Sequence, residues 1–306
     1  MSVVIKDLTK VFDHQAAVDH ISFTVRPGEI LGFLGPNGAG KSTTMKIAAC
    51  YLAPTSGTVE VSGYDIMTQS IRVRERLGYL PENNPLYLDL YVKEYLAFIA
   101  RLHGIRNIHR RVQEMIGITG LGPEQGKKIG QLSKGYRQRV GLAQALIHDP
   151  EVLIMDEPTS GLDPNQIVEI RQLIRNISRE KTVILSTHIM QEVQAICDRV
   201  VIIHRGKLVA DNTVGELASA WKGKKQIRIE FSGKPDAGLF RNLDGLDKME
   251  MEGDRVLKIT FSTDRDARQD IFRIAAENNL PVVGLSQEEL SIENIFRELT
   301  RNGEQE

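Results

Sequence analysis

Residues 35–42 read Gly-Pro-Asn-Gly-Ala-Gly-Lys-Ser, a glycine-rich stretch that ends in a lysine and a serine. It fits G-x-x-x-x-G-K-[ST], a loop whose backbone N–H groups turn inward around phosphate oxygens while the next helix adds its positive end. The continuously apolar run at residues 30–34 precedes it, as expected of a strand covered on both faces. A segment with Met45 and Ala48 on one helical face follows it. With strand and helix both in place, a phosphate-binding loop is favoured over a glycine-rich turn without a ligand.

The loop predicts a site for ATP and Mg²⁺. Lys41 is expected to reach the β- and γ-phosphates, and the Ser42 hydroxyl to ligate the metal ion. The predicted nucleotide contacts are Gly35, Pro36, Asn37, Gly38, Ala39, Gly40, Lys41, Ser42 and Thr43.

A pair of carboxylates ends the apolar run at residues 152–155. Open α/β sheets bind their ligands at this carboxyl edge, so Asp156 can hold Mg²⁺ through water and Glu157 can polarise the attacking water. Adjacent strand residues point to opposite faces, so both act only if the strand bends into a turn, which Pro158 favours. The alternative is an ordinary pair of caps before the next helix.

The remaining apolar runs predict an α/β core joined to an antiparallel sheet. Residues 152–155, 183–186 and 200–203 are buried strands separated by helical stretches, which indicates a parallel sheet. Within residues 1–26 apolar and polar residues alternate, which indicates a half-buried antiparallel sheet. The alternating apolar positions there are Ile21, Phe23 and Val25.

Two further regions interrupt this core. Residues 89–103 form an amphipathic pattern ended by Gly104, within a helical insert of about residues 85–135. Composition changes near Trp221, so we expect domains at 1–220 and 221–306. The second fits a small ferredoxin-like α+β domain. Its expected elements are strands at 226–232, around 257–261 and at 282–285, and helices at 235–243, 265–279 and 291–300.

Composition limits the classes of partner. The 306 residues carry 39 basic and 40 acidic side chains, a net charge of −1, which argues against nucleic acid held by a general positive field. No apolar run approaches the ~18 residues of a membrane-spanning helix, and the first ten residues contain no signal-peptide pattern, so we expect a protein of the cytoplasm. Cys50 and Cys197 lie in apolar segments and are expected to be small buried residues rather than a disulfide.

A third motif, Leu-Ser-Lys-Gly-Tyr at residues 132–136, gives the sequence a family resemblance. With it, the chain resembles the ATP-binding cassette family, the ATPase subunits of ABC transporters, over nearly all of residues 1–220. Six elements occur in the family's order: Phe12, the loop at 35–43, the signature at 132–136, Asp156 with Glu157, the Ser-Gly-Leu-Asp loop at 160–163, and His188.

The resemblance implies a head-to-tail dimer of two cassettes, either two copies or this chain with a paralogue. Ser133, Lys134 and Gly135 would close over the γ-phosphate held by Lys41 of the partner subunit. Backbone N–H groups and a hydroxyl at a helix start are anion donors. The family carries Leu-Ser-Gly-Gly-Gln here, so Lys134 and Tyr136 are departures that leave the serine and the second glycine in place.

The same resemblance assigns three single residues. Asp163 would belong to the loop at the dimer interface, His188 would contact the γ-phosphate and hold Glu157, and Phe12 would stack on adenine. A surface histidine and a core phenylalanine are the alternatives for the last two.

The sharpest departure lies in Leu-Pro-Glu-Asn-Asn-Pro-Leu-Tyr at residues 80–87. Most cassettes carry a glutamine at the position of Glu82, with its amide in the Mg²⁺ shell. This segment resembles ATPases of gliding-motility ABC systems, within the ABC-2 exporter group. Glu82 is therefore a predicted metal ligand beside Ser42 and Asp156, and a solvated loop residue is the alternative.

These observations predict an ATPase with Lys41, Glu157 and His188 as catalytic residues. The resemblance implies an integral-membrane permease docked at the helical insert, and a peripheral position on the inner face of the cell membrane. A soluble cassette ATPase acting on ribosomes or DNA is the main alternative, but such chains carry two cassettes or long coiled coils. A P-loop kinase would not explain the motifs at 132–136 and 160–163.

Overall fold

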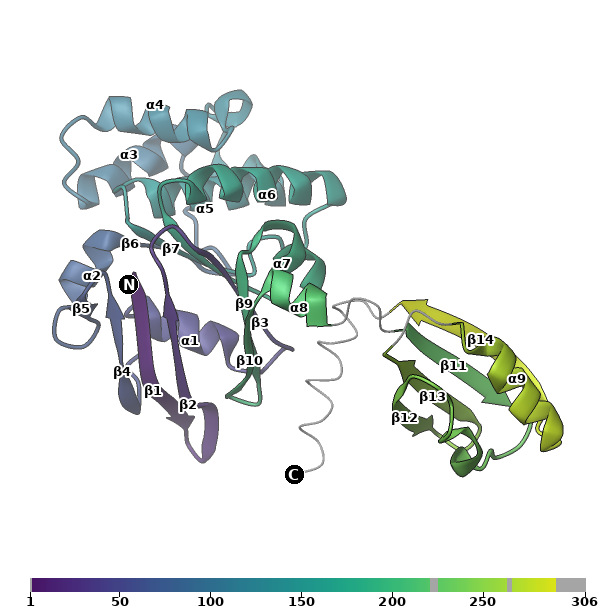
Figure 1. Ribbon diagram of the computed structural model, residues 1–306. Coiled ribbons are helices and arrows are strands. Elements are labelled where there is room, and N and C mark those ends of the chain that lie inside the picture. Colours follow the sequence, from purple (N-terminus) through teal and green to yellow (C-terminus); the bar gives the residue numbers. More distant parts are fainter. Residues whose placement is uncertain (1, 221–224, 263–265, 290–306) are drawn as a thin grey trace. The chain divides into compact units, whose positions relative to one another are not determined.

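The computed structural model describes residues 2–220, 225–262 and 266–289. They divide into two compact units, and the boundary along the chain falls between Val214 and Gly215 (Figure 1). No helix within the described ranges combines the length and the apolar character needed to cross a bilayer.

The first unit contains a six-stranded sheet. Its strand order is β10-β9-β3-β8-β7-β6, parallel except for the antiparallel pair of β9 and β10. The strands span Ile30–Leu34 (β3), Leu77–Leu80 (β6), Val152–Asp156 (β7), Thr182–Thr187 (β8), Arg199–His204 (β9) and Lys207–Thr213 (β10). Every residue of β3, β7 and β8 is buried, which confirms the predicted α/β core.

A second sheet of the same unit is antiparallel, in the order β2-β1-β4-β5. It comprises Val3–Phe12 (β1), Gln15–Val25 (β2), Ser56–Val61 (β4) and Tyr64–Asp65 (β5). Ile21, Phe23 and Val25 are buried as predicted. The ring of Phe23 stacks on that of Phe33 in β3 at a centroid distance of 5.3 Å, so the two sheets share one core.

Helices cover the parallel sheet, and Figure 1 shows α3, α4 and α5 together on one side of it. The predicted helix at 89–103 begins later, at Val92, where the Glu94 carboxylate accepts a hydrogen bond from the Tyr91 N–H (3.3 Å). Leu102, an apolar residue within the predicted amphipathic pattern, is 68% exposed. The helices span Lys41–Ala48 (α1), Ser70–Arg76 (α2), Val92–Leu102 (α3), Ile108–Ile118 (α4), Lys134–Leu146 (α5), Pro164–Ser178 (α6), Met190–Ile196 (α7) and Val214–Ala220 (α8).

The second unit is an antiparallel sheet in the order β12-β13-β11-β14. Its elements are Lys225–Phe231 (β11), a 3₁₀ turn at Ala237–Phe240, Leu246–Glu252 (β12), Val256–Phe261 (β13), Arg268–Glu277 (α9) and Val282–Glu289 (β14).

This order is that of the predicted ferredoxin-like fold, with its first helix reduced to the 3₁₀ turn. The strand β12 was missed, because its residues are at most half-buried and show no clean alternation. The predicted helix at 291–300 and Trp221 lie outside the described residues.

Both cysteines are free and only partly buried, which corrects the expectation of full burial. Cys197 contacts Gly32 of β3, where an added Cβ would lie 3.0 Å from its sulfur. It therefore fills space between β3 and α7 as a small side chain.

The packing of α5 on β6 predicts a pH dependence of stability. The Nε2–H of His148 donates to the Leu77 carbonyl oxygen (3.1 Å), and its ring stacks on that of His103 at 4.2 Å. Burial lowers the pKa of His148 from 6.5 to about 4, and His103 adds to the shift. The folded state therefore binds fewer protons than the unfolded state, and stability falls as the pH drops from 6.5 towards 4.

We expect His148→Gln to remove about 2 kcal/mol of the stability that the protein loses on going from neutral pH to about pH 5. Denaturant unfolding of both proteins at the two pH values measures this difference. His109→Gln, at an exposed position, is the matched control. Equal losses in the His148 variant and the unsubstituted protein would contradict the prediction.

Candidate active site

The phosphate loop joins β3 to α1 and depends on a close backbone approach. Gly40, with φ of 108°, precedes α1, and an added Cβ there would lie 2.3 Å from the Ala17 carbonyl oxygen. Only glycine fits both the conformation and the space. The loop is thereby held against β2 of the antiparallel sheet.

Lys41 is buried and folds back over this loop. Its ammonium group donates to the carbonyl oxygens of Gly35 (2.7 Å) and Pro36 (3.2 Å). An ammonium group has three protons, and Glu157 Oε1 lies 3.4 Å from Nζ. The loop, the lysine and the carboxylate therefore form one charged cluster.

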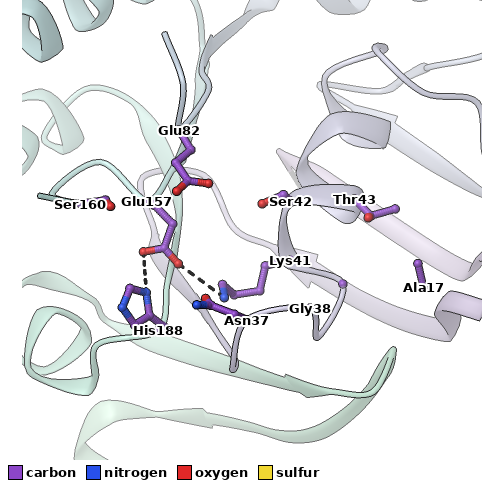
Figure 2. Close-up of a pocket in the computed structure, with 11 residues that line it drawn as sticks. Ala17, Asn37, Gly38, Lys41, Ser42, Thr43, Glu82, Glu157, Ser160 and His188 are labelled. Carbon is purple, nitrogen blue, oxygen red and sulfur yellow. Dashed lines mark hydrogen bonds and ion pairs between the residues drawn. The ribbon is translucent and has the colours of Figure 1, made fainter.

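Glu157 stands between Lys41 and His188 (Figure 2). It is 7% exposed, and its Oε2 lies 2.9 Å from His188 Nδ1. Oε1 receives no hydrogen bond from the described residues and has only the ion pair with Lys41. A buried carboxylate oxygen with spare acceptor capacity suits a water molecule that must be oriented and deprotonated.

The strand turns at this glutamate, as the sequence predicted. β7 ends at Asp156, and Glu157 has φ of 49°. Its N–H donates to the carbonyl oxygen (3.2 Å) and Oγ (3.1 Å) of Ser186 in β8, and Ser186 Oγ donates to Asp156 Oδ1 (2.5 Å). Ser186 thus fixes both carboxylates at the carboxyl edge of the sheet.

These groups border a cavity of about 470 Å³. Figure 2 shows the side chains of Ser42 and Glu82 facing the space beside Glu157. The lining residues are Ala17, Asn37, Gly38, Gly40, Lys41, Ser42, Thr43, Glu82, Glu157, Ser160 and His188. Hydroxyl and carboxylate oxygens are the donors that Mg²⁺ prefers, so Ser42, Glu82 and the buried Asp156 fit that ion.

Phe12 does not line this cavity. It lies at the end of β1 with 44% of its surface exposed, and Lys10 Nζ lies 5.1 Å from its ring centre. It is therefore not a core phenylalanine, and its stacking on adenine stays a prediction.

The signature residues and Asp163 lie outside the cavity of their own chain. Ser133 caps α5 by accepting a hydrogen bond from the Tyr136 N–H (3.3 Å), and Asp163 caps α6 by accepting one from the Gln166 N–H (3.0 Å). Lys134 lines a neighbouring cavity of about 560 Å³ that Glu82 also borders. The action of the signature residues and Asp163 on the nucleotide of a second subunit stays a prediction.

Glu192 is a functional support that the motifs did not indicate. It is 2% exposed in α7, and its carboxylate accepts hydrogen bonds from Thr187 Oγ1 (2.8 Å) and Thr159 Oγ1. These hydrogen bonds link Thr187, which precedes His188, to Thr159, which follows Glu157. In the sequence, an acidic residue between the apolar residues Met190 and Val193 could have indicated a buried carboxylate.

Comparison with known proteins gives one family. The ABC transporter profile matches residues 18–160. The bacitracin transport ATP-binding protein BcrA of Bacillus licheniformis is 34% identical over 308 residues, covering 99% of both chains. The Nod factor export ATP-binding protein I of Rhizobium etli is 32% identical over 299 residues, covering 96% of this chain and 92% of its own. Both alignments include the second unit.

A solved structure of the ATP-binding subunit of an ABC transporter is also similar. It superposes with a TM-score of 0.66 at 29% identity, covering 72% of this chain and 94% of its own.

The charged cluster predicts different effects for substitutions of Glu157 and of Lys41. Glu157→Gln keeps the shape of the side chain and removes the base, so ATP binding persists and hydrolysis falls by about 10²-fold or more. Lys41→Ala removes a charged donor to phosphate, and ATP affinity falls about 10- to 100-fold. Binding titrations and phosphate release measure the two effects.

Lys46→Ala is the matched control, since Lys46 is exposed on the same helix. It should change neither quantity by more than about twofold, an ordinary result for an exposed site. Unchanged ATP affinity in Lys41→Ala would contradict the assignment of the loop.

Proposed function

We propose, because the chain belongs to the ABC transporter family of ATP-binding subunits, that its hydrolysis of ATP drives a separate integral-membrane permease. ATPase activity comes with family membership. Beyond this activity, we propose the roles of single residues, the Mg²⁺ site, the second cassette and the permease.

The observation that carries the proposal is the carboxylate of Glu157 held between Lys41 and His188 at the cavity. Phosphoryl transfer to water requires positioning and charge stabilisation more than covalent chemistry. Glu157 would accept a proton from the attacking water, and His188 would hold that carboxylate in place. Lys41 would turn its ammonium group to the phosphates. Thr43 and the backbone N–H groups from Asn37 onward would complete the cradle.

Ser42, Asp156 and Glu82 are the proposed holders of Mg²⁺, which when bound supplies positive charge against the phosphate oxygens. Ser42 and Glu82 border the cavity, and Asp156 is fixed by the Ser186 hydroxyl. Their arrangement thus provides oxygen donors from three separate segments of the chain.

A dimer with a second cassette, either another copy or a paralogue, is part of the proposal. Ser133, Lys134 and Gly135 stand at the start of α5 with a hydroxyl, an ammonium group and the N–H groups of a first helical turn, which suit a phosphate of the partner. Asp163 would lie at the same interface. Phe12, exposed at the hairpin, would contact adenine.

Export is the proposed direction, and the relatives named for bacitracin transport and Nod factor export support it. The segment at residues 80–87 resembles gliding-motility ATPases, and we propose that system as the pathway. The names of these relatives support an exporter without pointing to gliding motility. The second unit, which both alignments include, would be an accessory domain; the sequence predicts its start near residue 221, and the compact unit starts at Gly215.

We propose that the permease docks at the helical insert, so that the subunit lies on the inner face of the cell membrane. A cleft of about 520 Å³ lies between α3 of the insert, the end of α5 and the segment after α1. Tyr51 (71% exposed) and Leu102 (68% exposed) line it and are available to a partner. Exposed large apolar side chains at one cleft are typical of an interaction site.

Glu82 tests the metal site. Glu82→Gln keeps the reach of the side chain but loses attraction to Mg²⁺ and repulsion from phosphate, each roughly 4 kcal/mol at about 4 Å and an effective dielectric of ~20. These terms oppose each other, so we expect hydrolysis to change by less than about tenfold. Glu82→Ala removes the ligand and should uncouple hydrolysis from transport.

The measurement is the Mg²⁺ dependence of hydrolysis in the complex with the permease, together with the transport rate. Asn83→Ala, at the exposed neighbouring residue, is the control. Coincident curves and transport rates for all variants would make Glu82 a solvated loop residue.

The docking cleft gives a second test. Tyr51→Ala combined with Leu102→Ser removes two exposed apolar anchors, and we expect the affinity for the permease to fall at least about 30-fold, since a single interface anchor is worth about 2 kcal/mol. Hydrolysis by the isolated subunit should stay unchanged. Val168→Ser, 63% exposed on α6, is the matched control. Full retention of the permease by the double variant would refute docking at this cleft.

A further inference from the structure

A glycine in the middle of α5 marks a close approach between two segments. Gly141 is buried, and a Cβ added there would lie 1.7 Å from Asn84 Nδ2 and 2.7 Å from Leu80 Cδ1. Glycine is less favourable than alanine inside a helix, so its presence needs a packing reason. The side chain of Asn84 occupies the space that any other residue at 141 would need.

In this position the side-chain amide of Asn84 lacks one hydrogen bond. Its Nδ2 is buried and has no acceptor among the described residues. A buried amide without an acceptor is unfavourable, so the contact of Nδ2 with Gly141 is a packing contact and not a hydrogen bond.

Asn84 also lies two residues after Glu82, which borders both the nucleotide cavity and the neighbouring cavity. The latter is also lined by Asn84 and by Lys134 of the signature. The chain from 82 to 84 therefore runs from the nucleotide cavity to the helix that carries the signature.

The other end of α5 is fixed to β6 by a second close approach. A Cβ added to Gly78 of β6 would lie 2.2 Å from the Ala145 carbonyl oxygen. Ala145 is one turn after Gly141 in α5, so the contact with β6 and the contact with Asn84 both fall on the half of the helix that is distant from Ser133.

We infer that Asn84, pressed against Gly141, is a positioning residue that transmits the place of Glu82 to the signature helix. The inference rests on the proposed function, in which Glu82 responds to the metal-bound nucleotide and Ser133 acts on the partner's phosphate. Asn84 touches neither ligand. Its effect falls on the rate of hydrolysis rather than on nucleotide affinity.

The test is a double-mutant cycle in the full chain. Gly141→Ala forces Asn84 away, and Asn84→Ala removes the side chain that presses on the helix. Each single variant is expected to lower kcat at least about tenfold while KM for ATP stays within about twofold, because the phosphate loop is untouched. The double variant regains space at residue 141, and its kcat should exceed that of Gly141→Ala at least about threefold.

Gly117→Ala is the matched control, since a Cβ at that helical glycine of α4 meets nothing within 4 Å. Its kcat should equal that of the unsubstituted protein. Thermal unfolding of every variant separates loss of fold from loss of positioning. If Gly141→Ala fails to fold, Asn84→Ala, which adds no atoms, decides alone by its kcat and KM.

Two results would overturn the inference: a double variant no faster than Gly141→Ala, or an Asn84→Ala protein with unchanged kcat. Failure of the proposed function would look different. In that case the unsubstituted protein would lack Mg²⁺-dependent hydrolysis, or Lys41→Ala would retain it.

Discussion

Burial of the Glu157 carboxylate between Lys41 and His188 is the interaction on which the rest of the first unit depends. A buried charge is costly unless charges and hydrogen bonds compensate it. The compensation comes from three strands at once: the loop after β3 supplies Lys41, β8 supplies Ser186 and leads to His188, and β7 supplies the glutamate. Because β8 lies between β3 and β7, the three carboxyl ends meet at one edge of the sheet. The strand order is therefore a requirement of the charge cluster.

Close approaches of backbone, more than side-chain contacts, hold the other parts in register with this edge. The carbonyl oxygen of Ala17 contacts Gly40, which fixes the antiparallel sheet to the phosphate loop. The carbonyl oxygen of Ala145 contacts Gly78, which fixes α5 to β6. At each position a Cβ would overlap a backbone oxygen, which cannot rotate away as a side chain can. Glycine is thus needed where α5 and the antiparallel sheet join the core.

The sequence predicted the features whose physical cause is local. The phosphate loop, the turn at Glu157 and the buried strands follow from residue type, spacing and Pro158. Features set by contacts between distant segments were missed. Glu192 is charged within an apolar helix, and only the threonines at 159 and 187 explain it. Leu102 fits an amphipathic pattern but is 68% exposed at the end of α3, and β12 lacked alternation because neither of its faces is fully buried.

Glu82 borders two cavities, and each of them is also lined by cationic side chains. On one side lie Lys41 and the phosphate loop, and on the other lie Lys134 and Arg137 at the start of α5. A neutral amide would interact weakly with both cationic groups, whereas a carboxylate is attracted to both. Because Coulomb energy falls with distance, a shift of this carboxylate towards one cavity weakens its attraction to the other. Lys134, the signature's departure from the family pattern, lines the cavity that Glu82, the departure in the segment at 80–87, also borders. The two substitutions place opposite charges on segments whose relative position the contact between Asn84 and Gly141 already constrains.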